Sequence, residues 1–357
     1  MPIVKCGAYG AKNRMANNSS IDNDRLLEAA EKYWRAGKHQ EAAQLLSEVL
    51  TRIPRHAHAN YMMAMLALTT RDYVVAEKLL SAAISQNTPD TYIYQKALGD
   101  MYRDSSTFDK AILAYIDAVK LKPDYLEALT NLGTVSLIVE KIDDAQKYYN
   151  QVLTIDPKHA ISLYNLGYIH ESQMKIEDAK DYYVRAINAN PNFAEAYNNL
   201  GTILKNSGAL AQAEESYIKA TSLKENYADA HFNLGITLRK MKSFQRALQE
   251  FLTAHSIRPS PEISVNIGQI FMIQGQPNKA AEYFEQALSS RPDYIDAISS
   301  LASAYYKMGI IEKSYKLWKK ILPVDPYHAY ALNGIANCLK IFGQVDQAII
   351  QFKNAIL

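Results

Sequence analysis

The sequence has almost no cysteine and a formal net charge of only +2. Of its 357 residues only Cys6 and Cys338 are cysteines, and they lie far apart without a C-x-x-C spacing. This excludes a disulfide framework and a thiolate zinc site, and it predicts a reducing, cytoplasmic location. The 39 Lys and Arg residues nearly balance the 37 Asp and Glu residues. The chain therefore has no net field that would draw it to nucleic acid or to anionic membranes, and we expect neither as a partner.

Long apolar runs are missing as well. No stretch reaches eighteen apolar residues, and residues 1–20 lack the apolar segment of a signal peptide. Residues 1–22 are rich in Asn and Ser and predict a disordered leader.

Catalytic motifs are also lacking. His170-Glu171 begins like H-E-x-x-H, but Met174 stands where the second histidine is needed. His56 and His58 form an H-x-H pair without a third ligand at a sensible spacing. No phosphate-binding glycine loop and no G-x-S-x-G occur. The sequence thus predicts no catalytic residues, no cofactor and no metal site, and a chain that is not itself an enzyme.

What the sequence does have is a period of about 34 residues. Repeats of this length are helix pairs stacked many times, because one pair cannot bury its own apolar face. Six glycines recur at intervals of 34, 34, 34, 34 and 33 residues: Gly99, Gly133, Gly167, Gly201, Gly235 and Gly268. A frame set by these glycines gives ten units, the last one short: 23–56, 57–90, 92–125, 126–159, 160–193, 194–227, 228–260, 261–294, 295–328 and 329–357.

Apolar residues within each unit follow the spacing of two antiparallel helices. Counted from the first residue of a unit, position 8 is small, and position 24 is large, as at Tyr217, Phe251 and Trp318. A large residue opposite a small one lets the helices interdigitate. Glycine at position 15 suits a left-handed residue that ends the first helix, and proline at position 32 suits the turn before the next unit.

This pattern resembles the tetratricopeptide repeat over residues 23–357. The resemblance implies an all-α fold, a right-handed superhelical solenoid of about ten helix-turn-helix repeats, and a role in binding other proteins. One extra residue at Thr91 and one missing residue near Pro259 are the only slips in register.

One polar register does not fit the helical core. Asparagine is a poor residue inside a helix because its amide competes with the backbone, so a row of them indicates a common cause. Position 6 lies next to the buried position 7, which turns it toward the inner, concave wall. A carboxamide donates and accepts together and so matches an extended peptide backbone. Five consecutive units carry asparagine at position 6: Asn131, Asn165, Asn199, Asn233 and Asn266.

Residues beside these asparagines predict an aromatic and basic groove. Tyr164 and Phe232 stand at position 5, and Lys205, Arg239 and Lys240 stand at positions 12 and 13. We expect such a groove to favour a peptide with some acidic character. Two alternatives stay open: the cations form a solvated helix end, and the asparagines bond to one another as a purely structural ladder.

The asparagine register is similar to that in the tetratricopeptide arrays of O-GlcNAc transferases. The resemblance implies that the five asparagines bind the backbone of a polypeptide, although Met62, Ala97, Ser300 and Gly334 depart from the pattern. The leading hypothesis is a non-catalytic scaffold that binds an extended segment of another protein in this groove. The alternative is the acceptor-selecting region of a larger protein glycosyltransferase.

The printed sequence stops at Leu357, inside the second helix of the last unit. A solenoid normally ends in a polar capping helix. We therefore expect the apolar stacking face at this end of the solenoid to be covered, either by further chain or by self-association.

Overall fold

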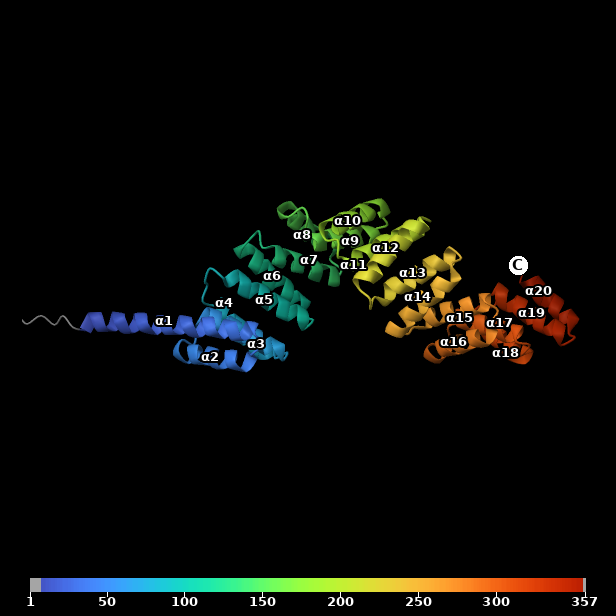
Figure 1. Cartoon of the computed structure of the whole chain (residues 1–357), viewed down its shortest axis with the longest axis horizontal. Coiled ribbons are helices and arrows are strands. Elements are labelled where there is room, and N and C mark those ends of the chain that lie inside the picture. Colours follow the sequence, from blue (N-terminus) through green and yellow to red (C-terminus); the bar gives the residue numbers. More distant parts are fainter. Residues whose placement is uncertain (1–7, 356–357) are drawn as a thin grey trace, which may run out of the picture. The chain divides into compact units, whose positions relative to one another are not determined.

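A computed structural model describes the backbone of residues 8–355 and the side chains of residues 22–355. All regular structure in this part of the chain is α-helical, and the helices follow one another in ten pairs (Figure 1). The chain divides into two compact units, residues 1–182 and 183–357, with the boundary inside helix α10.

The helices of the first unit are α1 (Ala8–Arg35), α2 (His39–Arg52), α3 (Ala57–Thr69), α4 (Tyr73–Ile84), α5 (Thr91–Asp104), α6 (Phe108–Leu121), α7 (Leu126–Ile138), α8 (Ile142–Ile155), α9 (Ala160–Ser172) and α10 (Ile176–Ala189). Those of the second are α11 (Ala194–Asn206), α12 (Leu210–Leu223), α13 (Ala228–Lys240), α14 (Phe244–Ile257), α15 (Pro261–Ile273), α16 (Pro277–Ser290), α17 (Ile295–Lys307), α18 (Ile311–Ile321), α19 (Ala329–Ile341) and α20 (Val345–Asn354). Every odd-numbered helix from α3 onward starts at the first residue of a predicted unit, except α5, which starts one residue earlier.

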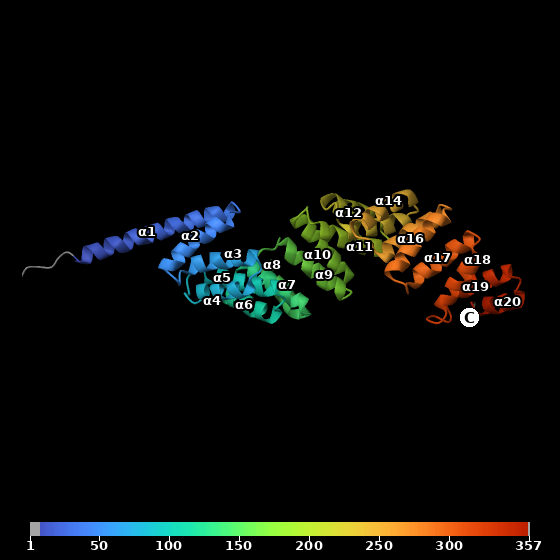
Figure 2. The ribbon, with the colours of Figure 1, turned by 90° about the horizontal axis from the view of Figure 1, so that it is seen from below.

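Helix α1 differs from the predicted disordered leader. It begins at Ala8, so residues 8–22 are helical, and it extends beyond the end of α2 (Figure 2). The sequence offers no glycine or proline between Gly10 and Gly37 that would interrupt this helix. The rest of the predicted leader, residues 1–7, lies outside the described residues.

The predicted left-handed residue at position 15 occurs in each of the ten repeats of about 34 residues. A positive φ lets the chain reverse direction between the two helices of a pair. Half of these residues are glycines and half are not: Gly37, Gly208, Gly275, Gly309 and Gly343, and Arg71, Ser106, Glu140, Met174 and Lys242.

The predicted packing of large against small residues is confirmed. Phe251 is fully buried, and its Cδ1 lies 2.6 Å from the position that a Cβ atom on Gly235 would occupy. Tyr217 lies against Gly201 in the same way, at 2.8 Å from its Cε1. Trp318 is also buried, as its place at position 24 predicts.

Each of the two compact units, residues 1–182 and 183–357, is a helical solenoid with two layers. In the first unit α5 contacts α7 and α7 contacts α9; in the second, α11 contacts α13, and α17 contacts both α15 and α19. The even-numbered helices pack chiefly against the odd-numbered helices before and after them. We call the face made by the odd-numbered helices of each unit its inner wall, because it is this face that carries position 6.

Candidate functional site

The five asparagines of position 6 lie one to a helix on the inner walls. Asn131 and Asn165 belong to α7 and α9 in the first unit, and Asn199, Asn233 and Asn266 belong to α11, α13 and α15 in the second. All five side chains are half-buried.

In the second unit the amides form a chain of hydrogen bonds. Lys205 Nζ donates to Asn233 Oδ1 at 3.2 Å, and Asn233 Nδ2 donates to Asn198 Oδ1 at 3.2 Å. Asn198 Nδ2 donates to Asn199 Oδ1, and Asn199 Nδ2 donates to the Tyr183 hydroxyl, both at 3.2 Å. The central member, Asn198, is buried. Asn198 stands at position 5, the same register as Tyr164 and Phe232, where the sequence predicts side chains beside the asparagine row.

The other asparagines have different partners. Asn131 Nδ2 donates to Asp100 Oδ1 at 2.8 Å, and the same carboxylate accepts the Tyr115 hydroxyl at 2.7 Å. Asn266 Nδ2 donates to the backbone oxygen of Glu262 at 2.8 Å, and its buried Oδ1 has no partner. The five amides are therefore not equivalent.

The amides are thus held within the protein, which is part of what the structural alternative predicts. A carboxamide has two N–H donors and two acceptor positions on its oxygen. The two hydrogen bonds of Asn233 use one donor and one acceptor position, which leaves one of each on a half-buried side chain. The chain of bonds fixes the rotamers of these amides.

The three predicted cations lie on α11 and α13. Lys205 and Arg239 are half-buried and Lys240 is exposed. Burial, together with the nearby charge of Lys240, lowers the pKa of Lys205, and burial lowers the pKa of Arg239. Arg239 NH1 donates to Gln269 Oε1 on α15. Among the described residues, none of the three cations forms an ion pair with a carboxylate.

The acids at position 2 of α11, α13 and α15, in contrast, are paired. Lys224 Nζ lies 2.9 Å from Glu195 Oε1, and Arg291 NH2 lies 2.7 Å from Glu262 Oε1. Arg258 pairs with Asp229. In each case the cation stands at position 31 of the same repeat as the acid that it binds. On α11, α13 and α15 the acids at position 2 are therefore neutralised, whereas the cations of α11 and α13 have no carboxylate partner.

A hollow of about 500 Å³ lies beside Arg239 on this wall. It is lined by polar and apolar side chains together, and Tyr330, which is 75% exposed, stands at its border. The lining side chains come from α13, α15, α16, α17, α19 and the turn before α19: Arg239, Gln269, Met272, Ile273, Phe284, Asp296, Ser299, Ser300, Ser303, His328 and Tyr330.

The two predicted aromatic residues are placed differently. The ring of Phe232 lies 5.8 Å from that of Phe251 and packs against the core of the second unit. Tyr164 is half-buried on α9. The sequence analysis did not single out Asp296 and Tyr330, which both stand at position 2 of their repeats. For Asp296 a signal was present, because the residue at position 31 of the same repeat shows whether an acid at position 2 has a cation as its partner.

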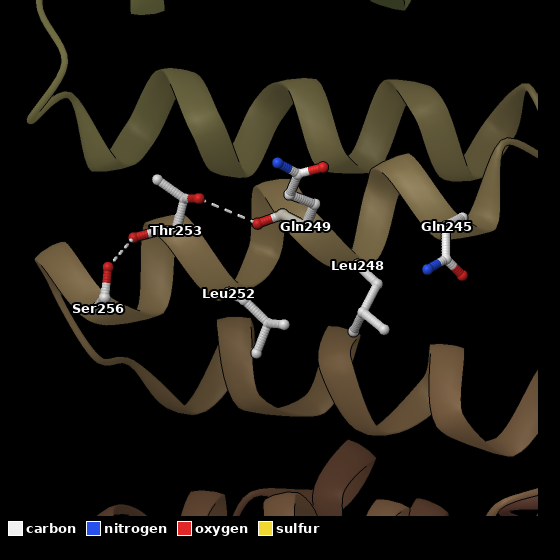
Figure 3. A pocket seen from close by; sticks show the side chains of 6 residues that line it. All are labelled: Gln245, Leu248, Gln249, Leu252, Thr253 and Ser256. Atoms are coloured by element: carbon white, nitrogen blue, oxygen red, sulfur yellow. Dashed lines mark hydrogen bonds between the residues drawn. The ribbon is translucent and has the colours of Figure 1, made fainter.

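A second hollow lies on the opposite layer, along α14, with a volume of about 470 Å³ (Figure 3). All its lining side chains come from this one helix: Gln245, Leu248, Gln249, Leu252, Thr253 and Ser256. Two of them form hydrogen bonds within the helix. Thr253 Oγ1 donates to the backbone oxygen of Gln249 at 3.1 Å, and Ser256 Oγ donates to the backbone oxygen of Thr253 at 2.8 Å. Its lining has no charged side chain to select a ligand.

Helix α20 has an exposed apolar surface. Val345, Ile349 and Ile350 of α20 are each about half exposed, at 55, 46 and 55%. Of the helices in the described part of the chain, none combines the length and the apolar character needed to cross a bilayer.

Comparison with known proteins agrees with this architecture. The chain is 25% identical over 89 residues to the BBSome complex member BBS4 of Bos taurus, which is 25% of this chain and 17% of that protein. It is 30% identical over 117 residues to the TPR repeat-containing protein PA4667 of Pseudomonas aeruginosa, which is 32% of this chain and 20% of that protein. The matched parts are thus no more than a fifth of these relatives.

A solved structure of Pseudomonas aeruginosa pilF has the same fold, with a TM-score of 0.53 and 21% identity, over 58% of this chain and 94% of that one. Models of the tetratricopeptide repeat match residues 33–98 and 271–338, 126–193, 182–215 and 232–295. These matches cover most of the chain and agree with the helix pairs and glycine contacts described above. The chain belongs to the tetratricopeptide repeat family.

Proposed function

We propose that this chain is a non-catalytic scaffold that binds an extended segment of another protein along the inner wall of its second unit. The observation that carries the proposal is the set of unpaired cations, Lys205, Arg239 and Lys240, beside a fixed row of amides. The bovine relative BBS4 is a member of a multiprotein complex, which is the setting that such a scaffold fits.

The charges of the wall favour an acidic segment. Because Glu195, Asp229 and Glu262 are already paired with cations of their own units, an acidic ligand meets positive charge without strong repulsion. Burial lowers the pKa of Lys205 and Arg239, which means that these cations lack the full solvation of water and gain from an added carboxylate.

The asparagines supply backbone contacts. The second N–H and second acceptor position of Asn233 suit one peptide unit, and we assign contacts with the same segment to Asn199 and Asn266 on this wall as well. A hydrogen bond of this kind contributes about 0.5–1.5 kcal/mol net, and a partly exposed ion pair about 0.2–1 kcal/mol. A few such contacts give an affinity in the micromolar to millimolar range.

The test is a selection from a displayed library of random fifteen-residue peptides against the whole chain. We expect enrichment of acidic peptides, and we expect Lys205→Gln combined with Arg239→Gln to weaken the best of them by about two- to thirtyfold. Lys219→Gln is the matched control, because Lys219 is an exposed lysine on α12 in the other layer. An unchanged affinity in the double variant, with an unchanged circular dichroism spectrum, would overturn the proposal.

The asparagine register also favours a second candidate, the acceptor-selecting region of a protein glycosyltransferase. It predicts that the enriched peptides are sugar acceptors when the full reading frame that contains this chain is supplied with a nucleotide sugar. Binding without any transfer supports the scaffold alone.

A further inference from the structure

On the inner wall that carries the hollow, one 34-residue repeat lacks the ion pair between position 31 and position 2. In three successive units a Lys or Arg at position 31 binds the acid at position 2. In the next unit position 2 is Asp296, but position 31 is Asp325. Asp325 Oδ1 instead accepts the backbone N–H of Tyr327 at 3.2 Å. Among the described residues Asp296 has no ion-pair partner, and its side chain is exposed.

Asp296 lines the hollow together with Tyr330 and His328. His328 Nδ1 accepts the backbone N–H of Ala331 at 3.1 Å, which fixes the ring beside Tyr330 at a centroid distance of 6.4 Å. Tyr330 is 75% exposed, so one face of its ring is open to a ligand. A carboxylate and an open aromatic face that line one hollow can together bind a Lys or Arg side chain, through an ion pair and a cation–π contact.

Arg239 lines the same hollow from α13, whereas Asp296 lines it from α17. Its guanidinium bonds to Gln269, not to Asp296, so the two opposite charges of the hollow do not neutralise each other. A ligand that crosses the hollow meets an unpaired cation at one place and an unpaired carboxylate at another.

We propose that Asp296 and Tyr330 bind a Lys or Arg side chain of the same extended segment whose acidic residues lie against Arg239 and Lys205. The segment therefore carries both charges in a fixed order, and this order sets the direction in which it lies on the wall. The inference rests on the proposed function and adds the identity of the second charge and the polarity of binding.

The peptide selection also tests this inference. On the wild-type chain we expect enriched peptides to carry an acidic residue and a Lys or Arg in one constant order. On Asp296→Asn we expect the acidic residue to remain enriched and the Lys or Arg to be lost, with affinity for the wild-type peptide reduced about two- to fivefold. Asp293→Asn is the matched control, because Asp293 is exposed in the turn before α17 and does not line the hollow.

A second variant tests the same site without removing the carboxylate. Asp325→Lys places a cation at position 31, where it can bind Asp296 as Arg291 binds Glu262. We expect it to lower the affinity for the basic residue as much as Asp296→Asn does. Because this change also removes the bond to the Tyr327 N–H, circular dichroism must show the helices intact, and Asp325→Asn serves as its control.

The outcomes separate the two proposals. Enriched acidic peptides whose binding is insensitive to Asp296→Asn would overturn the inference and leave the proposed function standing. The absence of any enriched peptide that depends on Lys205 and Arg239 would overturn both. Peptides that bind equally well in reversed sequence would overturn the fixed direction.

Discussion

A Cβ atom on Gly268 would lie 2.4 Å from Cε1 of Phe284, which is fully buried. Real Cβ atoms do not approach carbon so closely, so glycine is required here by contact and not by backbone conformation. Gly99 meets Tyr115 at 2.5 Å in the same way. The pairs join the two helices of one repeat, and they explain why glycines recur with the period of the fold.

We therefore expect Gly268→Ala to destabilise the second unit by about 1–3 kcal/mol, the usual cost of an overpacked core. Urea unfolding followed by circular dichroism measures this change. The double variant Gly268→Ala with Phe284→Leu should recover part of the loss, because the smaller side chain relieves the contact. Equal stability of Gly268→Ala and the wild type would contradict the packing argument.

Gly208 presents the opposite case, because its φ is +84° and a Cβ atom on it would meet nothing within 4 Å beyond its own helix turn and chain neighbours. Alanine there costs about 1–2 kcal/mol for the left-handed backbone and regains about 0.4–1 kcal/mol from a less flexible unfolded chain. We expect Gly208→Ala to lower the free energy of unfolding by about 1 kcal/mol. Gly208→Asn should cost less, since asparagine tolerates this conformation; a larger loss for asparagine would contradict the explanation.

The sequence alone was enough to predict these two roles of glycine. Both follow from the repeat period, because a constant contact or turn in each unit leaves a constant residue at one position. The helix pairs, the left-handed turns and the buried Trp318 could be predicted for the same reason.

The departure of Gly334 from the asparagine register has a cause that sequence could not supply. A Cβ atom on Gly334 would lie 2.3 Å from Cε2 of Trp318, so the large indole ring excludes any side chain at this position 6. The contact joins one 34-residue repeat to the next and depends on the orientation of the Trp318 ring.

The partners of the asparagines could not be predicted either. Position 6 indicates the face of the helix, but not that Asn131 bonds to Asp100 or that Asn233 bonds to Asn198. Such bonds depend on rotamers and on the distance between neighbouring helices. The pattern of position 2 against position 31, in contrast, is present in the sequence and would have revealed Asp296.

His231 makes the stability of the second unit depend on pH. Its Nδ1 lies 2.7 Å from Glu250 Oε2 on α14, and its Nε2 lies 3.1 Å from the backbone oxygen of Glu225. Both ring nitrogens face acceptors, and the bond to Glu250 raises the pKa of His231 above its ordinary value of 6.5. The stabilisation is therefore complete below pH 6.5 and is lost as the pH rises through the raised pKa.

Urea unfolding of the wild type and of His231→Gln at pH values from about 5.5 to 9 measures this effect, in steps of about half a unit. We expect the difference in unfolding free energy between the two to shrink as the pH rises. Glu250→Gln should flatten the pH dependence in the same way, because the charged partner is gone. A difference that stays constant over this range would show that the His231 contact does not titrate.

Salt should weaken the binding of acidic peptides to the inner wall. Lys205 and Arg239 are half-buried and Lys240 is exposed, so ions screen their attraction to a ligand only in part. We expect the dissociation constant of an enriched acidic peptide to rise several-fold between about 0.05 and 0.5 M sodium chloride, measured by fluorescence anisotropy. The rise should be smaller in Lys205→Gln with Arg239→Gln and unchanged in Lys219→Gln. A salt dependence equal in all three proteins would place the attraction elsewhere on the chain, whereas a flatter response in the double variant assigns it to the two cations beside the amides.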